Sequence, residues 1–200
     1  MRPKPGFEDY DRVLAVTGAF SDGRRIETDM VFRSFKRKAS DGPGFPKNLL
    51  NLTNDVPYGF GILPMWGGRP DSQGITPRRG WNFCIAWFYS RYKGVGMEFS
   101  YKQGDLSPKW ISTYRNFNVE ENRKYFLNVE CWPEREETGR HVLYRQRMKW
   151  WAEGESEPDN WMELDDIAGS TLPDGEYAVA LVAHRSQVDF GPVTVKPIKQ

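Results

Sequence analysis

The chain has 200 residues and a formal net charge of +1, from 28 Lys and Arg against 27 Asp and Glu. That length fits one core, so we expect a single domain over residues 1–200. The balanced charge and the absence of any apolar run of about 18 residues argue against nucleic-acid binding and membrane insertion.

The first clear strand signal lies at residues 25–33, where apolar and charged side chains alternate. This spacing predicts a half-buried strand with Ile26, Met30 and Phe32 on its inner face. A glycine-thinned strand follows at residues 58–63.

Two long segments rich in Gly and Pro, at residues 36–57 and 67–80, flank that second strand. Long loops are uncommon in a compact domain unless they shape a binding site.

Residues 81–92 are apolar at successive positions, which indicates a central strand covered on both faces. The pattern Gly94-Val95-Gly96 predicts a turn into a strand at residues 97–102. We expect helix only in short pieces such as residues 119–123.

A hairpin is predicted from residues 125–132 and 141–151, joined by a charged turn. If Leu127 and Val129 face the core, alternation places the intervening side chains outward. The predicted outward residues are Asn128, Glu130, Trp132, Arg145, Arg147 and Lys149. Glu130 should then lie beside an arginine, either as a surface ion pair or as an acid held ionised for binding or base catalysis.

A final pair of strands is expected at residues 176–184 and 188–196. Together these elements predict an all-β fold, a two-sheet antiparallel β-sandwich. Cys84 and Cys131 lie in apolar strands, and we expect both to be reduced and buried.

Several stretches resemble the concanavalin A-like lectin/glucanase superfamily, in its laminin-G-like branch. They are residues 20–23, 125–129, 147–150 with Glu157, Pro158 and Trp161, and 188–190 with Val193 and Val195. The resemblance implies a concanavalin A-like jelly roll of two antiparallel sheets, with an extended saccharide held on the concave one. It also implies a possible structural calcium with Asp189 at a ligand position, and no required cofactor.

The resemblance is weaker for particular activities. The glucanase motif E-x-D-x-x-E is matched by Glu27 and Asp29, but Phe32 or Arg33 stands where its third acid belongs. The arginine-rich and Gln-x-His motifs of the alginate-lyase branch have no counterpart at matching positions.

Aromatic residues make up 14% of the chain, more than a core of this size easily absorbs. In a saccharide site, aromatic side chains stack on the sugar rings and polar side chains form hydrogen bonds with the sugar hydroxyls. The predicted stacking residues are Trp66, Trp81, Trp87, Tyr89 and Trp151, and the predicted polar contacts are Asn128, Arg145 and Arg147. Packing in the core is the alternative for each ring.

Catalytic candidates are Glu130, His184 and Glu98. A lyase needs a base and a cation beside the uronate carboxylate, which His184 and Arg185 would supply. Further candidates are Tyr89, Tyr101, Tyr114 or Tyr144 as acid, and Arg33, Arg91 or Arg115 as the cation. A hydrolase needs two facing carboxylates, for which Glu98 and Glu130 are a candidate pair.

Three functions therefore remain open on the sequence. The first is binding of a polysaccharide or oligosaccharide on a concave sheet, and the second is a lyase or hydrolase acting in that groove. The third is a protein-interaction or adhesion module, which predicts a flat apolar patch. We expect a monomer at a secreted or cell-surface location, although residues 1–10 contain no apolar signal core.

Overall fold

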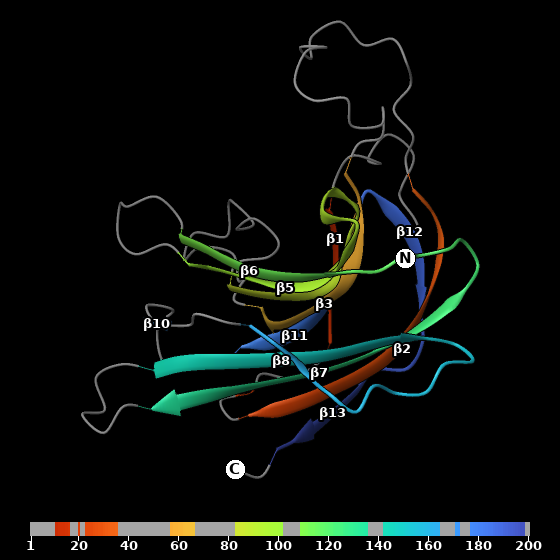
Figure 1. The fold of residues 1–200 in the computed structure, drawn as a ribbon. Helices are drawn as coiled ribbons and strands as arrows, with labels where there is room; N and C mark the ends of the chain where they lie inside the picture. Colours follow the sequence, from red (N-terminus) through yellow and green to blue (C-terminus); the bar gives the residue numbers. More distant parts are fainter. Residues whose placement is uncertain are drawn as a thin grey trace, which may run out of the picture.

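The computed structural model consists of two antiparallel β-sheets packed face to face (Figure 1). It describes residues 11–16, 20, 23–35, 57–66, 83–101, 109–135, 142–164, 171–172 and 177–198. The predicted all-β, two-sheet sandwich is thereby confirmed. Within these residues no helix is long and apolar enough to cross a membrane.

One sheet has six strands in its described part, in the order β1-β11-β3-β4-β5-β6. Their bounds are Asp11–Ala15 for β1, Ala178–His184 for β11, Gly59–Trp66 for β3, Phe83–Tyr89 for β4, Gly94–Tyr101 for β5 and Lys109–Asn116 for β6. The short 3-10 helix η1 (Ser90–Tyr92) connects β4 to β5.

The other sheet has the order β10-β8-β7-β2-β12, with β13 also paired to β2 and β9 to β8. The bounds are Thr171–Leu172 for β10, Val142–Ala152 for β8, Lys124–Arg135 for β7, Arg24–Phe35 for β2, Ser186–Phe190 for β12, Thr194–Pro197 for β13 and Met162–Glu163 for β9. We call these layers the six-stranded and the seven-stranded sheet.

The core lies between the layers and is built by alternation along each strand. The predicted inner face of β2 is confirmed, because Ile26, Met30 and Phe32 are buried while Glu27, Asp29 and Val31 are only half-buried. Cys84 and Cys131 join this core as buried free thiols, as expected.

The hairpin predicted from the charged segment is also confirmed. Strand β7 pairs with β8 from Tyr125 opposite Ala152 to Arg135 opposite Val142. Leu127 and Val129 are buried in the core, so Asn128 and Glu130 face outward from the seven-stranded sheet.

Three local expectations were wrong. Gly94 and Gly96 belong to β5, and the turn before them is η1 with Lys93 in the left-handed conformation (φ 49°). Residues 119–123 form no helix. The single strand expected at residues 188–196 is divided into β12 and β13, and residues 191–193 between them belong to no strand.

Both sheets bend in the same direction, so the outer face of the six-stranded sheet is concave and that of the seven-stranded sheet is convex (Figure 1). The outward side chains of a strand lie on the concave face if the strand belongs to the six-stranded sheet, and on the convex face if it belongs to the seven-stranded sheet. This division decides which candidate residues can meet one ligand.

Candidate functional site

The concave face carries a cluster of rings. We call Trp87, Tyr89, Tyr92, Tyr114 and His184, together with Glu98, the ring cluster. Strand pairing brings most of them together, since His184, Gly59, Tyr89 and Gly94 lie in one row across the sheet. The parallel row two residues further along each strand holds Gly61, Trp87, Gly96 and Tyr114.

Glycines in the strands on both sides of β4 leave room for the rings of Trp87 and Tyr114 to pack flat against the sheet. A Cβ at Gly61 would lie 2.6 Å from the Cβ of Trp87, and a Cβ at Gly59 would lie 2.7 Å from its indole ring. At Gly96 a Cβ would reach the Tyr114 ring at 2.5 Å. These glycines therefore form the bed on which the rings rest.

A chain of hydrogen bonds fixes one side of the cluster. The Nε1 of Trp87 donates to the Tyr114 hydroxyl at 2.8 Å, and this hydroxyl donates to Oε1 of Glu98. Burial raises the pKa of Glu98, while the bond from Tyr114 and the charge of Arg91 act against that rise. Burial and the Glu98 carboxylate raise the pKa of Tyr114, so this phenol keeps its proton at any physiological pH.

Tyr89 occupies the centre of the ring cluster. It stacks on Trp87 with ring centroids 4.4 Å apart, and its centroid lies 6.0 Å from that of His184 and 5.7 Å from that of Tyr92. Burial raises the pKa of Tyr89, and the positive charge of Arg91 partly counteracts this. A protonated phenol therefore lies beside an imidazole.

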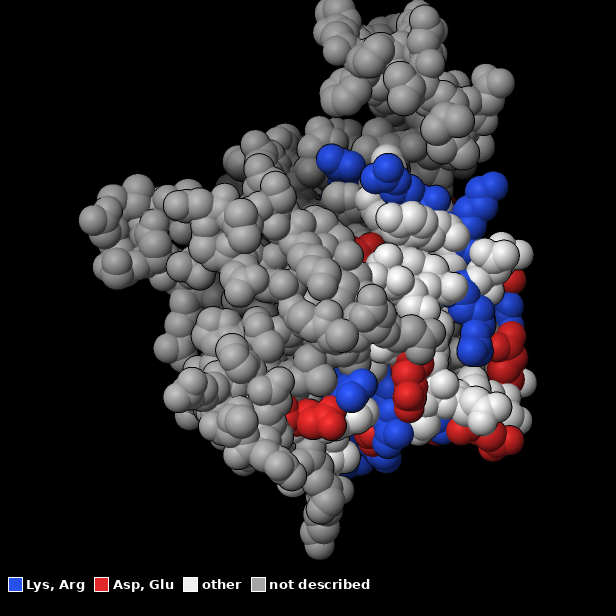
Figure 2. Space-filling model, turned by 60° about the vertical axis from the view of Figure 1, so that its left-hand side comes forward, with Lys and Arg blue, Asp and Glu red and all other residues white. Residues whose placement is uncertain are grey.

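Cations flank these rings. Arg91 and Lys93 are exposed on the turn after β4, and Arg185 follows His184 directly. The positive charges of Arg91 and Arg185 both act to lower the pKa of Tyr89. On the side of the molecule in Figure 2, Lys and Arg gather along the upper margin of the described surface, above uncharged side chains.

Glu130 lies on the opposite, convex face, so the prediction that it faces Glu98 was wrong. Its side chain is 1% exposed, and each carboxylate oxygen is held by one arginine. Arg25 binds Oε1 through Nε at 2.6 Å, and Arg147 binds Oε2 through Nε at 2.7 Å. The sequence allowed either a structural ion pair or a site at Glu130, and this arrangement is an ion pair. Glu130 pairs with the predicted Arg147 of β8 and also with Arg25 of β2.

Trp161 packs against these cations. Its ring centroid is 4.6 Å from the Arg147 guanidinium, 5.0 Å from Nζ of Lys149 and 5.6 Å from the Arg25 guanidinium. The indole therefore ties the segment after β8 to the convex face.

The remaining predicted contacts divide between the two faces. Asn128, Arg145, Arg147 and Trp151 lie on the seven-stranded sheet, where Arg145 pairs with Glu134 and Trp151 stacks on Phe126. They cannot share a ligand with Trp87 and Tyr89, contrary to expectation. Trp66 packs beside the outer cluster of the six-stranded sheet, and Trp81 lies outside the described residues.

Two of the candidate cations for a lyase site also lie elsewhere. Arg33 belongs to the seven-stranded sheet and binds Asp189 at 2.7 Å. Arg115 is exposed, and it lies opposite Val95 on the side of β6 that faces the other sheet. The side chains of Tyr101 and Tyr144 are not among those described.

The proposed calcium at Asp189 stays a prediction. Within the described part of the chain there is no group of three or more His, Cys, Asp or Glu side chains that could hold a metal. Asp189 instead forms the ion pair with Arg33.

Sequence reasoning missed Tyr92 and the role of the glycines. The signal was present, because one Gly-x-Gly pattern at residues 59–61 and another at residues 94–96 lie on either side of the aromatic strand β4. Two such patterns flanking an aromatic strand indicate rings lying across it.

Comparison with known proteins shows similarity at the level of fold. No protein-family model and no curated protein matches the chain. Among solved structures, the chain is similar to the endo-β-1,4-glucuronan lyase from the fungus Trichoderma reesei, with a TM-score of 0.53 and 9% identity over 98% of this chain and 78% of that one.

It is also similar to the marine PL-14 alginate lyase from Aplysia kurodai, with a TM-score of 0.49 and 12% identity over 89% of this chain and 70% of that one. At such identities a likeness concerns the fold, and the likeness to the glucuronan lyase agrees with the two-sheet sandwich seen here.

Proposed function

We propose that this protein holds an extended, uronate-containing polysaccharide on its concave face and cleaves it by β-elimination. The observation that carries this proposal is that Tyr89 and His184 lie side by side in the ring cluster, with the charges of Arg91 and Arg185 acting on Tyr89. The fold shared with a glucuronan lyase is consistent with it.

The proposed chemistry assigns a role to each group. Elimination removes the proton on the carbon next to the uronate carboxylate and expels the glycosidic oxygen at the neighbouring carbon. His184 would take that proton, Tyr89 would protonate the leaving oxygen, and Arg91 with Arg185 would neutralise the carboxylate. The raised pKa of Tyr89 suits a proton donor.

Hydrolysis by two carboxylates is less well supported. Glu98 is the one carboxylate among the side chains described on the concave face, and Glu130 lies on the convex face. A hydrolase of the usual kind needs its two acids roughly 5 to 9.5 Å apart on the same side.

Three broader assignments accompany this proposal. The two-sheet architecture with a concave outer face supports membership of the concanavalin A-like superfamily. A protein that acts on polysaccharides would work outside the cell, as a secreted or surface protein. We propose a monomer, because the concave face forms from one chain.

The test is to incubate the full chain with acidic polymers such as polyglucuronate and polymannuronate, and with neutral glucans. Ultraviolet absorbance reports the new conjugated double bond, and reducing ends report any cleavage. We expect both signals with an acidic polymer, and a loss of about 100-fold or more in rate for His184→Gln and for Tyr89→Phe.

Reducing ends without ultraviolet absorbance would indicate hydrolysis and refute the elimination. Binding of an acidic polymer without either signal would reduce the function to a lectin-like one. Full activity in folded His184→Gln would remove the imidazole from the mechanism.

A further inference from the structure

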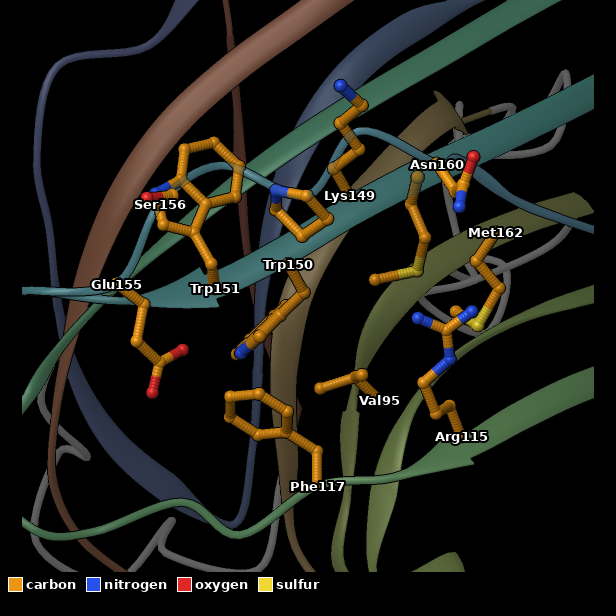
Figure 3. A pocket seen from close by; sticks show the side chains of 12 residues that line it. Val95, Arg115, Phe117, Lys149, Trp150, Trp151, Glu155, Ser156, Asn160 and Met162 are labelled. Atoms are coloured by element: carbon orange, nitrogen blue, oxygen red, sulfur yellow. The ribbon is translucent and has the colours of Figure 1, made fainter.

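Apart from the concave face, the protein has a hollow at the edge of the sandwich, between β6 of one sheet and β8 of the other (Figure 3). Its volume is about 210 Å³. That is many times the roughly 10–15 Å³ that one water molecule needs, yet below the roughly 300 Å³ at which pockets for drug-sized ligands begin. The hollow therefore fits a ligand of one ring.

The hollow has a positive and a negative end. Arg115 and Glu155 lie on opposite sides of it (Figure 3). Within the described part of the chain no acidic side chain pairs with Arg115. Glu155, in contrast, accepts from Arg123 and from the backbone N–H of Ala152, each at 3.1 Å.

Trp150 contributes a buried donor that lacks an acceptor. Its Nε1 is buried and has no hydrogen-bond partner among the residues that the structure describes, which is rare for a buried polar atom. In Figure 3 this nitrogen faces the side of the hollow where Glu155 and Phe117 lie. Phe117 and Tyr125 pack against the indole at centroid distances of 6.2 and 5.9 Å and so fix its orientation.

We propose that this hollow is a binding site for a single uronate unit, with its carboxylate on Arg115 and one ring hydroxyl between Trp150 and Glu155. A hydroxyl can accept from the indole N–H and donate to a carboxylate at the same time. A guanidinium matches a carboxylate in geometry and charge. The choice of a uronate among sugar acids rests on the proposed function.

The apolar lining completes the match. Met148, Met162 and Phe117 offer apolar surface to the C–H face of a sugar ring. Tyr114 and Arg115 are consecutive on β6, the first on the concave face and the second on the inner side. The hollow therefore lies directly across one strand from the ring cluster, where it would hold a sugar acid at the margin of the polymer site.

The test uses the full chain labelled with nitrogen-15 and sodium glucuronate as the probe. The indole N–H signal of Trp150 is the one that disappears in Trp150→Phe. We expect it to move in a saturable way with glucuronate and to stay in place with glucose, which has no carboxylate. Arg115→Gln should weaken glucuronate binding about tenfold, the loss expected for a charged hydrogen bond.

Arg145→Gln is the matched control, because this arginine lies on the convex face and pairs with Glu134. It should leave the glucuronate affinity unchanged. If Trp150→Phe does not fold, calorimetric titration of the native protein and of Arg115→Gln with glucuronate gives the same comparison.

The inference is overturned if glucuronate leaves the Trp150 signal in place, if glucose binds equally well, or if Arg115→Gln binds like the native protein. Its failure is distinct from failure of the proposed function. Polymer cleavage without glucuronate binding here refutes only this site. Glucuronate binding here without any polymer binding or cleavage refutes only the proposed function of the concave face.

Discussion

Trp87 donates its indole hydrogen to the hydroxyl of Tyr114 at 2.8 Å, and so the two rings are joined across the glycine row of β5. The hydroxyl in turn donates to Glu98. The hydroxyl oxygen of Tyr114 thus links the rings of the concave face to the carboxylate of Glu98.

Tyr114→Phe tests this link. Removal of the hydroxyl deprives a buried donor and a buried carboxylate of their shared partner, so we expect unfolding free energy to fall by about 1–3 kcal/mol. Urea unfolding followed by tryptophan fluorescence measures it. Tyr92→Phe is the control, because Tyr92 is 45% exposed and its loss of a hydroxyl should cost no more than about 0.5 kcal/mol.

Glu98 predicts a pH dependence of stability. Burial raises the pKa of Glu98 above its usual 4.5, so the folded state holds this proton more tightly than the unfolded state. Relative to Glu98→Gln, the native protein should therefore be most stable below pH 4.5 and lose stability as pH rises through the folded pKa. Unfolding curves of both proteins across this range measure the difference, and a difference that grows in the opposite direction would contradict the buried ionisable group.

Gly61→Ala tests the glycine bed. The added methyl group would lie 2.6 Å from Cβ of Trp87 and would also crowd the carbonyl of Ala86. Overpacking of this kind costs about 1–3 kcal/mol, and we expect weaker polymer binding as the indole is displaced. Gly154→Asn is the control, because that exposed turn residue has φ 86° and open space around it. Equal melting temperatures for the two variants would argue against the bed.

Glu130→Gln separates structure from catalysis. Loss of the charge between Arg25 and Arg147 should cost about 1.5–3 kcal/mol, since charged hydrogen bonds are lost but both arginines still reach water. The folded variant should retain polymer cleavage, because Glu130 lies on the convex face. Glu134→Gln removes an exposed pair and should cost at most about 1 kcal/mol. Loss of cleavage in folded Glu130→Gln would restore this residue as a catalytic candidate.

We expect Cys84 and Cys131 to react slowly with thiol reagents in the folded protein. Burial raises the pKa of Cys84 well above its usual value, and contact with Cys131 raises it further, so the thiol stays protonated and unreactive. We expect native protein to react slowly with an aromatic disulfide reagent at mildly alkaline pH, and denatured protein to reveal both thiols at once. Rapid reaction of the native protein would show that the core opens readily.

The sequence correctly predicted which side chains of β2, β7 and β8 face the core and which face outward. Period-two alternation placed Glu130 and Arg147 on one outer surface, because a hairpin with a buried face permits a single register. The same argument assigned Ile26, Met30 and Phe32 to the core.

The sequence did not reveal which outer surface each strand would join. Glu98 and Glu130 are both outward residues, but β5 and β7 belong to different sheets, and pairing between distant strands decides this. Gly94 and Gly96 were misassigned for a related reason. The missing side chain of Gly96 leaves room for the Tyr114 ring on β6, and a Cβ at Gly94 would meet the backbone of the same strand, which neighbours β5 in the sheet but follows it in the chain.

Arg185 alone separates β11 from β12, and it adopts a left-handed conformation with φ 49° as the chain crosses from one layer to the other. The layers are therefore pinned together beside His184 and cannot slide there without breaking backbone pairing in both. Slow amide hydrogen exchange should accordingly mark this corner as the rigid anchor of the molecule, and breathing motions that admit a polymer should occur at the far margin, along β6.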